Sequence, residues 1–250
     1  MTLFYSAFRI RKSITLEKEE LFGLFDNNQR LISNADLDRL PAKLKSYLIK
    51  AGVIGSFRES NVSFTQKGQI KTAQNKKWRH FKAKQYMSSR LPGFIWSATS
   101  FPLFIRDKSF EGVGEVKINL LGYKNLATFH GQKINESALV RYLGELMFFP
   151  IGFLSKDIEW ENNSKGSLKA RLKVRNVVAE GVFYFNDDGL LHQFKSRRYM
   201  GETQESFTGI AEDYTMMAGM YLPSKMKAIW NLNNGDFEYF IAQITDYRID

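Results

Sequence analysis

One segment constrains the fold of this chain more than any other. Residues 135–150 carry a strong helix signal inside a sequence that otherwise alternates as strands do. At about 100° per residue, the apolar side chains of this segment fill one broad arc. They are Ala138, Leu139, Tyr142, Leu143, Leu146, Met147 and Phe149. Arg141 and Glu145 lie one turn apart at the edge of the arc, so the sequence predicts a helix over residues 135–149 that covers a β-sheet.

The segments on both sides of this helix follow a period of two, which is typical of half-buried strands. The predicted strands cover residues 79–87, 94–98, 115–120, 122–129, 168–175, 178–185, 190–198, 229–232 and 237–247. Residues 186–189 and 233–235 read Asn-Asp-Asp-Gly and Asn-Asn-Gly, which are strong hairpin signals. We therefore expect about nine or ten strands joined by short turns in one antiparallel sheet.

The first part of the chain has helical spacing instead. Residues 13–25 and 36–51 each place leucines and aromatic side chains on one face, and Pro41 falls within the first turns of the second segment. This pattern predicts a helical N-terminal extension over residues 1–56 and a β-rich body over residues 57–250, in a single domain overall.

The balance of charge is strongly basic, with a formal net charge of +10. Such a charge attracts anionic partners, among them nucleic acid, a lipid surface or an acidic ligand. Four basic side chains alternate along one predicted strand: Lys169, Arg171, Lys173 and Arg175. We expect this basic face to contact an anionic membrane surface, and Lys195, Arg197 and Arg198 extend it on a nearby strand. Nucleic-acid binding is an alternative, but no aromatic residues interleave with these cations for base stacking. An ordinary solvated face is the other alternative.

The sequence contains few residue patterns that indicate catalysis. It has no cysteine, which excludes disulfides, thiol catalysis and Cys-based zinc sites. The three histidines are not paired at ligand spacing, and no phosphate-binding loop or dinucleotide fingerprint is present, so we predict no metal and no cofactor. Glu145 or Asp107 acting as a general acid or base is the enzyme alternative, although Arg141 is a natural ion-pair partner for Glu145.

We recognise no signal peptide at the N-terminus and no apolar run of the roughly 20 residues that a membrane span needs. A cytoplasmic location is the default expectation, and an exported or membrane-anchored relative is the alternative.

Several short motifs follow one another in a specific order. They are Leu40-Pro41, Trp78-x-x-Phe81-x-Ala83-x-Gln85, Pro92-Gly93-Phe94-x-Trp96-x-Ala98, Asp107, Gly112-x-Gly114, Arg141-Tyr142-Leu143-x-Glu145, Pro150, Trp160, Gly219-x-Tyr221-x-Pro223 and Trp230. Their order and spacing, over roughly residues 36–248, resemble a bacterial family of unknown function. No established activity comes with that family.

The strand-rich pattern also resembles the open β half-barrels of bacterial lipoprotein carriers. This resemblance implies an α+β fold with a strongly curved antiparallel sheet, helices packed on its concave face, and the N-terminal helical extension. It implies a shell that binds or carries an apolar or amphiphilic ligand, with lipids among the candidates. We therefore expect a binding protein rather than an enzyme.

The residues expected to line that cavity come from the aromatic strands and the central helix. They are Phe94, Trp96, Leu103, Tyr142, Leu146 and Trp230. Arg141 and Glu145 are expected to form its polar margin, where Arg141 could bind an anionic head group.

Overall fold

The computed structural model describes residues 2–23, 30–163 and 166–250. Within them, thirteen strands form one antiparallel sheet in the order β6-β5-β4-β3-β2-β1-β13-β12-β11-β10-β9-β8-β7. The strands of its first half are β1 (Asn61–Ile70), β2 (Arg79–Ser88), β3 (Gly93–Ser100), β4 (Leu103–Phe110), β5 (Val113–Leu120) and β6 (Lys124–His130). Those of its second half are β7 (Ile158–Asn162), β8 (Leu168–Val174), β9 (Val177–Phe185), β10 (Leu191–Met200), β11 (Thr203–Met217), β12 (Met220–Leu232) and β13 (Gly235–Ile249).

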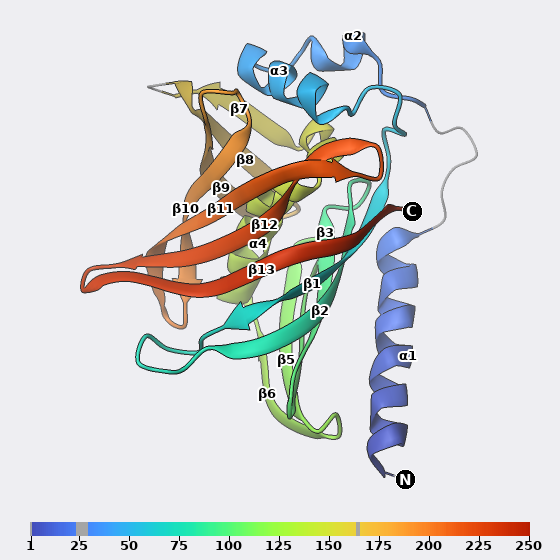
Figure 1. Ribbon diagram of the computed structural model, residues 1–250, viewed down its shortest axis with the longest axis vertical. Helices are drawn as coiled ribbons and strands as arrows, with labels where there is room; N and C mark the ends of the chain where they lie inside the picture. The colour runs from blue at the N-terminus through green and yellow to red at the C-terminus, as the bar shows by residue number, and fades with distance from the viewer. Residues whose placement is uncertain (1, 24–29, 164–165) are drawn as a thin grey trace.

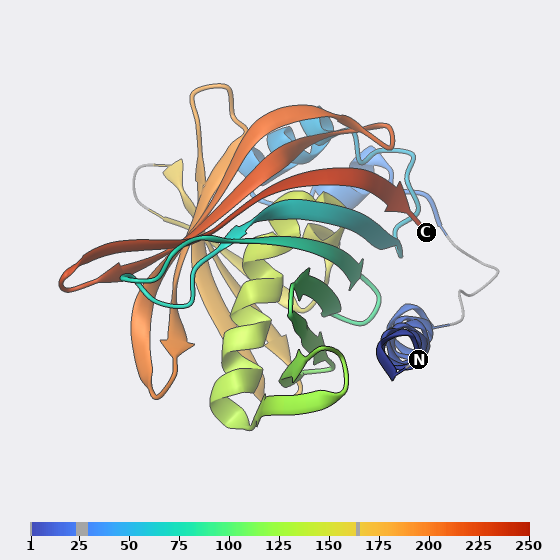
Figure 2. The ribbon, with the colours of Figure 1, turned by 60° about the horizontal axis from the view of Figure 1, so that its bottom comes forward.

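The strand order divides the sheet into two meanders, in which neighbours in the sheet are also neighbours in sequence. The first meander runs from β1 to β6 and the second from β7 to β13, and they join where β1 pairs with β13. The sheet curls around helix α4 (Gln132–Glu145), which connects the two meanders in sequence and lies on the concave side (Figures 1 and 2). This confirms the predicted α+β fold with a strongly curved antiparallel sheet.

Helix α4 is buried on nearly all sides, because the sheet surrounds it. Its central residues from Ser137 to Val140 are all buried, as are Tyr142 to Gly144. The helix begins at Gln132, three residues before the predicted start, because Asn135 donates its backbone N–H to Gly131 inside the first turn. It ends at Glu145, earlier than predicted.

The chain after α4 continues as two short 3₁₀ turns, η1 (Leu146–Phe148) and η2 (Pro150–Leu154). Phe149 between them adopts φ −143° and ψ 69°, outside the α region. A residue before proline is pushed out of the α region by the pyrrolidine ring, and this explains why the predicted helix does not extend to residue 149.

The close approach of α4 to the sheet depends on one phenylalanine ring. Phe194 of β10 is fully buried, and its ring lies against two glycines, Gly144 of α4 and Gly181 of β9. A Cβ placed on Gly144 would lie 2.5 Å from Phe194 Cδ1, and one on Gly181 would overlap the other side of the ring. The ring therefore fills space that exists only because both neighbours lack a side chain.

The N-terminal helix α1 (Thr2–Phe22) lies outside the shell, against the convex side of β2 and β3 (Figure 2). Leu21 and Phe22 pack there against Tyr86 and Ile95 in a separate small core. The Glu17 carboxylate ties the helix to β4 through Arg106 at 2.8 Å and Lys108 at 3.1 Å.

Helix α1 begins before the predicted residue 13, and the last residues of that prediction, Leu24 and Phe25, lie outside the described residues. The second predicted helix is interrupted. It divides into α2 (Asn34–Leu37) and α3 (Ala42–Ala51), because Pro41 adopts an extended backbone as the N-cap of α3. Side chains of α2 and α3 pack into the main core of the β-rich body, and the predicted division at residues 56 and 57 stays a prediction.

The sheet has more strands than the nine or ten expected, and β1, β4, β7 and β11 lie outside the predicted ranges. Strand β4 was missed because its sequence does not alternate regularly between apolar and polar side chains. Its outward-facing Arg106 and Lys108 pair with Glu17 of α1. Strand β11 was missed because most of its fifteen residues are polar or small and only partly buried. Tertiary pairing, rather than local pattern, makes these segments strands.

We predict that Gly144→Ala destabilises the protein. Overpacking against the confined Phe194 ring costs about 1–3 kcal/mol, more than the roughly 1 kcal/mol that alanine gains over glycine in a helix. Urea denaturation should show a net loss of about 1 kcal/mol or more. Gly209→Ala on β11 is the matched control, because its Cβ would meet nothing closer than 3.7 Å. Equal stability of Gly144→Ala and the wild type would contradict this account.

Candidate functional site

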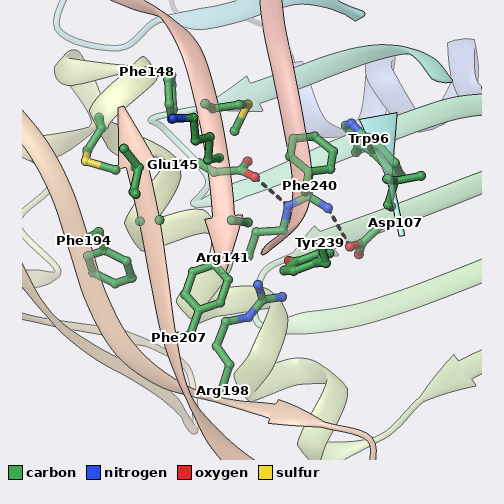
Figure 3. Close-up of a pocket in the computed structure, with 18 residues that line it drawn as sticks. Trp96, Asp107, Arg141, Glu145, Phe148, Phe194, Arg198, Phe207, Tyr239 and Phe240 are labelled. Atoms are coloured by element: carbon green, nitrogen blue, oxygen red, sulfur yellow. Dashed lines mark hydrogen bonds and ion pairs between the residues drawn. The ribbon is translucent and has the colours of Figure 1, made fainter. Parts of the chain in front are cut away.

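A cavity of about 170 Å³ lies between α4 and the concave face of the sheet (Figure 3). Both meanders contribute to it, because its walls come from β1, β3 and β4 on one side and from β10 to β13 on the other. Most of its lining is apolar, and the largest apolar side chains are Trp96, Phe148, Phe194, Phe207 and Phe240, with Met147 and Met226 beside them. The polar groups are few, as in small-molecule sites generally.

The polar end of this cavity is built around the guanidinium of Arg141. Its Nε donates to Glu145 Oε1 at 2.7 Å, one turn along α4, and its Nη1 donates to Asp107 Oδ2 of β4 at 2.7 Å (Figure 3). Its Nη2 donates to Gln85 Oε1 of β2 at 3.3 Å, and the Gln85 amide nitrogen in turn donates to Glu145. The guanidinium also lies over the ring of Phe94, 4.6 Å from its centroid.

These contacts leave Arg141 charged, with each of its three nitrogens donating to a side-chain oxygen. Burial alone would lower the pKa of its guanidinium, but the charges of Glu145 and Asp107 outweigh burial and raise that pKa above its ordinary value. Each nitrogen of the guanidinium already donates to a side-chain oxygen. The Arg141 side chain is therefore a structural clamp between α4 and the first meander.

A second arginine lines the same cavity without a carboxylate partner. Arg198 of β10 donates from its Nε to the backbone oxygen of Ser137 at 3.1 Å and to Ser137 Oγ at 3.3 Å. Its guanidinium lies 4.8 Å from the centroid of the Phe207 ring and 5.6 Å from that of Trp230. Within the described residues it forms no ion pair, although Glu205 lies opposite it in the β10–β11 register.

The structure brings part of the predicted site together. Trp96, Arg141 and Glu145 line the cavity, as does Asp107 of the enzyme alternative. The Trp96 indole N–H donates to Gln66 Oε1 at 2.6 Å, which fixes the ring in the cavity wall.

Other predicted lining residues lie next to the cavity or away from it. The Phe94 ring lies under the Arg141 guanidinium. Trp230 stacks on Tyr239, and Tyr239 lines the cavity. Tyr142 donates its hydroxyl to Ser88 O at 2.8 Å, Leu146 is buried in the core, and Leu103 is half-buried at the start of β4. Ligand contact by these five residues stays a prediction.

Sequence reasoning missed Phe194, Phe207 and Tyr239, and it assigned Arg198 to the outer basic face. One signal was present for Arg198. In the period-two pattern of β10 it shares its face with the buried Phe194, whereas Lys195 and Arg197 alternate with it and are exposed. Phe207 and Tyr239 reach the cavity only because the sheet curls back on itself.

The predicted basic face carries less free charge than the sequence indicated. Arg171 pairs with Glu159 and Glu180, and Lys169 pairs with Glu180 at 3.5 Å. Arg175 is not on the strand, because β8 ends at Val174 and Arg175 adopts φ 54° in the following turn, where it pairs with Glu111. Contact of Lys169, Arg171, Lys173 and Arg175 with an anionic membrane, or with nucleic acid, stays a prediction.

Metal-binding clusters and membrane-spanning helices are two further features that bear on function. Among the described residues, no group of three or more His, Asp or Glu side chains is arranged to hold a metal ion. Within the same part of the chain, no helix is long and apolar enough to cross a membrane.

We predict that Arg141→Met strongly destabilises the protein. Removing one partner of a buried ion network leaves Glu145 and Asp107 facing each other without a cation, which costs about 3–5 kcal/mol. Adding Asp107→Asn and Glu145→Gln to this variant should restore at least half of the lost free energy of unfolding, measured by urea denaturation. A single variant as stable as the wild type would show that the clamp contributes nothing.

The comparisons with known proteins concern family and fold. The curated proteins contain no match to this chain. Among solved structures, a LolA superfamily protein from Nitrosomonas europaea is similar, with 10% identity and a TM-score of 0.44 over 86% of this chain and 90% of that chain. A protein-family model described as a family of unknown function (DUF6544) matches residues 30–242, close to the span of the motifs described above. The chain therefore belongs to this family of unknown function, DUF6544, as the order of its motifs predicted.

Proposed function

We propose that this protein binds an apolar or amphiphilic small molecule, of the lipid class, in the cavity beside α4. One observation carries the proposal: a mostly apolar cavity, partly open to solvent, lies between α4 and both meanders, with a few convergent polar groups at its margin. Protein cores are normally filled, so an apolar space of this size needs a reason. Binding sites for small apolar ligands have this composition.

The size of the cavity limits what it holds. Its volume is about 170 Å³, close to the roughly 150 Å³ of an apolar cavity that binds benzene. A segment of one alkyl chain or one ring fits this space, whereas several acyl chains of a large lipid do not fit without movement of α4. The proposed ligand is therefore a small or single-chain molecule.

The charged groups support binding over catalysis. Glu145 and Asp107, the candidate acid and base, are both held by the Arg141 guanidinium at 2.7 Å. A carboxylate committed to a structural ion pair is poorly placed to exchange protons with a substrate. The enzyme alternative therefore has no observation in its favour beyond the position of these two side chains.

We expect the purified protein to retain its ligand. Native mass spectrometry should show a bound mass in near-stoichiometric amount, and solvent extraction followed by lipid analysis should recover a single-chain amphiphile. The Gly144→Ala variant, whose added methyl group meets the Phe194 ring in the cavity wall, should carry less of it. Protein that is empty in native spectra, and that takes up no single-chain amphiphile when incubated with one, would contradict the proposal.

We predict that Gly209→Leu abolishes ligand binding without unfolding the protein. Gly209 lines the cavity, and a Cβ placed on it would lie 3.7 Å from Phe207 Cε1 and 3.9 Å from Met147 Cε, its nearest neighbours. A leucine side chain there would occupy the ligand space, and filling a cavity commonly adds about 0.5–2 kcal/mol of stability. Thermal unfolding should therefore remain unchanged or rise, while titration with dodecanol should show no binding. Binding equal to that of Gly209→Ala would place the ligand elsewhere.

A further inference from the structure

Strands β9 and β10 pair along only part of their length. Their ladder runs from Leu191 opposite Phe185 to Lys195 opposite Val182 and then ends. Beyond it, residues 177–181 of β9 pair with β8, and residues 196–200 of β10 pair with β11. The sheet thus divides here, and we call this gap the β9–β10 opening. The end of the β10–β11 hairpin projects from the sheet beside α4 (Figure 2).

A groove of about 590 Å³ occupies the β9–β10 opening. Its floor is α4, which contributes Ser137 and Val140, and one wall is β9, with Val178 and Val182. The opposite wall is β10, from Lys195 to Tyr199. Side chains of α4 are therefore reached from outside through a gap in the sheet, rather than around one of its edges.

The groove is lined by more cations than anions. The cations are Lys169, Lys195, Arg197 and Arg198, and the anions are Glu136 and Glu180. Glu180 is already paired with Lys169 and Arg171. Within the described residues, Lys195, Arg197 and Arg198 form no ion pair.

These three cations make only neutral contacts in the described structure. Lys195 Nζ lies 5.4 Å from the centroid of the Tyr184 ring, and Arg197 Nη2 donates to Gln204 O at 2.6 Å. Arg198 donates through its Nε to Ser137. The rim of the opening therefore carries a net positive charge.

Arg198 belongs to the linings of both the groove and the inner cavity. Its Nε faces Ser137 in the groove, while its guanidinium plane lies over Phe207 in the cavity. Arg141, the other arginine of the cavity, has each of its nitrogens engaged. Of the two arginines, Arg198 is therefore the one able to bind an anionic group. It lies where the groove meets the inner cavity.

We propose that the β9–β10 opening admits a single-chain anionic amphiphile, whose carboxylate or phosphate head binds Arg198 while a segment of its tail lies in the inner cavity. This rests on the proposed function and names the ligand class of that same site. A planar guanidinium matches a carboxylate or phosphate in a bidentate geometry. Lys195 and Arg197 at the rim attract the head group and raise its association rate.

The test separates the head group from the tail. Calorimetric titration with laurate, dodecyl phosphate and dodecanol compares two anions with a neutral molecule of the same chain length. We expect the wild type to bind at least one anion more tightly than dodecanol, and the stronger of the two identifies the head group. Arg198→Gln should weaken binding of that anion about ten- to a hundred-fold, the loss expected for hydrogen bonds to a charged group, and should weaken dodecanol binding by a clearly smaller factor. Arg198→Lys should lose less.

Arg248→Gln is the matched control, because Arg248 is exposed on β13 and away from the opening. Equal affinity of the wild type for the anions and dodecanol, or an Arg198→Gln variant that binds the anions normally, would overturn the inference while leaving the proposed function standing. Binding of none of the three compounds would instead contradict the proposed function itself.

The route through the opening is tested by association rates. Lys195→Glu should slow association of the preferred anion and reduce its dependence on salt, with little effect on dissociation. Lys82→Glu is the control, because Lys82 is exposed on β2 in the other meander. Equal slowing by both variants would mean that net charge, rather than the β9–β10 opening, guides the ligand, and would overturn the proposed route.

Discussion

The buried guanidinium of Arg141 is the interaction on which the arrangement of this shell depends. A charge removed from water must be paired and hydrogen-bonded, and here its partners come from α4, β2 and β4. These contacts therefore fix both the rotation of α4 about its axis and its position along that axis relative to the first meander. Because the second meander packs against the opposite side of α4, this one cluster also sets how far the sheet can close around the helix.

The cavity lies directly beside a tightly packed part of the same layer, because Gly144, Phe194 and Gly209 all belong to its lining. At Gly144 and Gly181 the absent side chains are replaced by the Phe194 ring, and the space is full. At Gly209 an added Cβ would meet its nearest atoms at ordinary contact distances of 3.7 Å and 3.9 Å, so the space beside this glycine is not filled by another side chain. Glycine thus has opposite roles in two neighbouring positions of the same layer. The contrast explains how a tightly packed core can contain a defined apolar hole without general looseness.

The sequence predicts the central helix and the antiparallel strands from local periodicity, whereas the curved sheet was expected only from the resemblance to lipoprotein carriers. It also predicts that Arg141 and Glu145 form an ion pair at the site. It does not predict the strands β4 and β11, whose partners and not their own patterns make them extended. Nor does it predict that Phe207 and Tyr239 face Trp96, since such contacts arise from the curvature of the sheet, which no local pattern encodes.

The two meanders meet along a single ladder, β1 with β13, which joins residues far apart in the chain. Phe64 and Tyr247 stack across it at 5.6 Å, and at Gly68 the strands approach too closely for a Cβ. Nearly all other strand pairing is local, so each meander can form early in folding and this ladder closes the shell late. The cavity is lined by both meanders, so a molecule bound there would contact both and would add its binding free energy to the closure of the shell along this ladder.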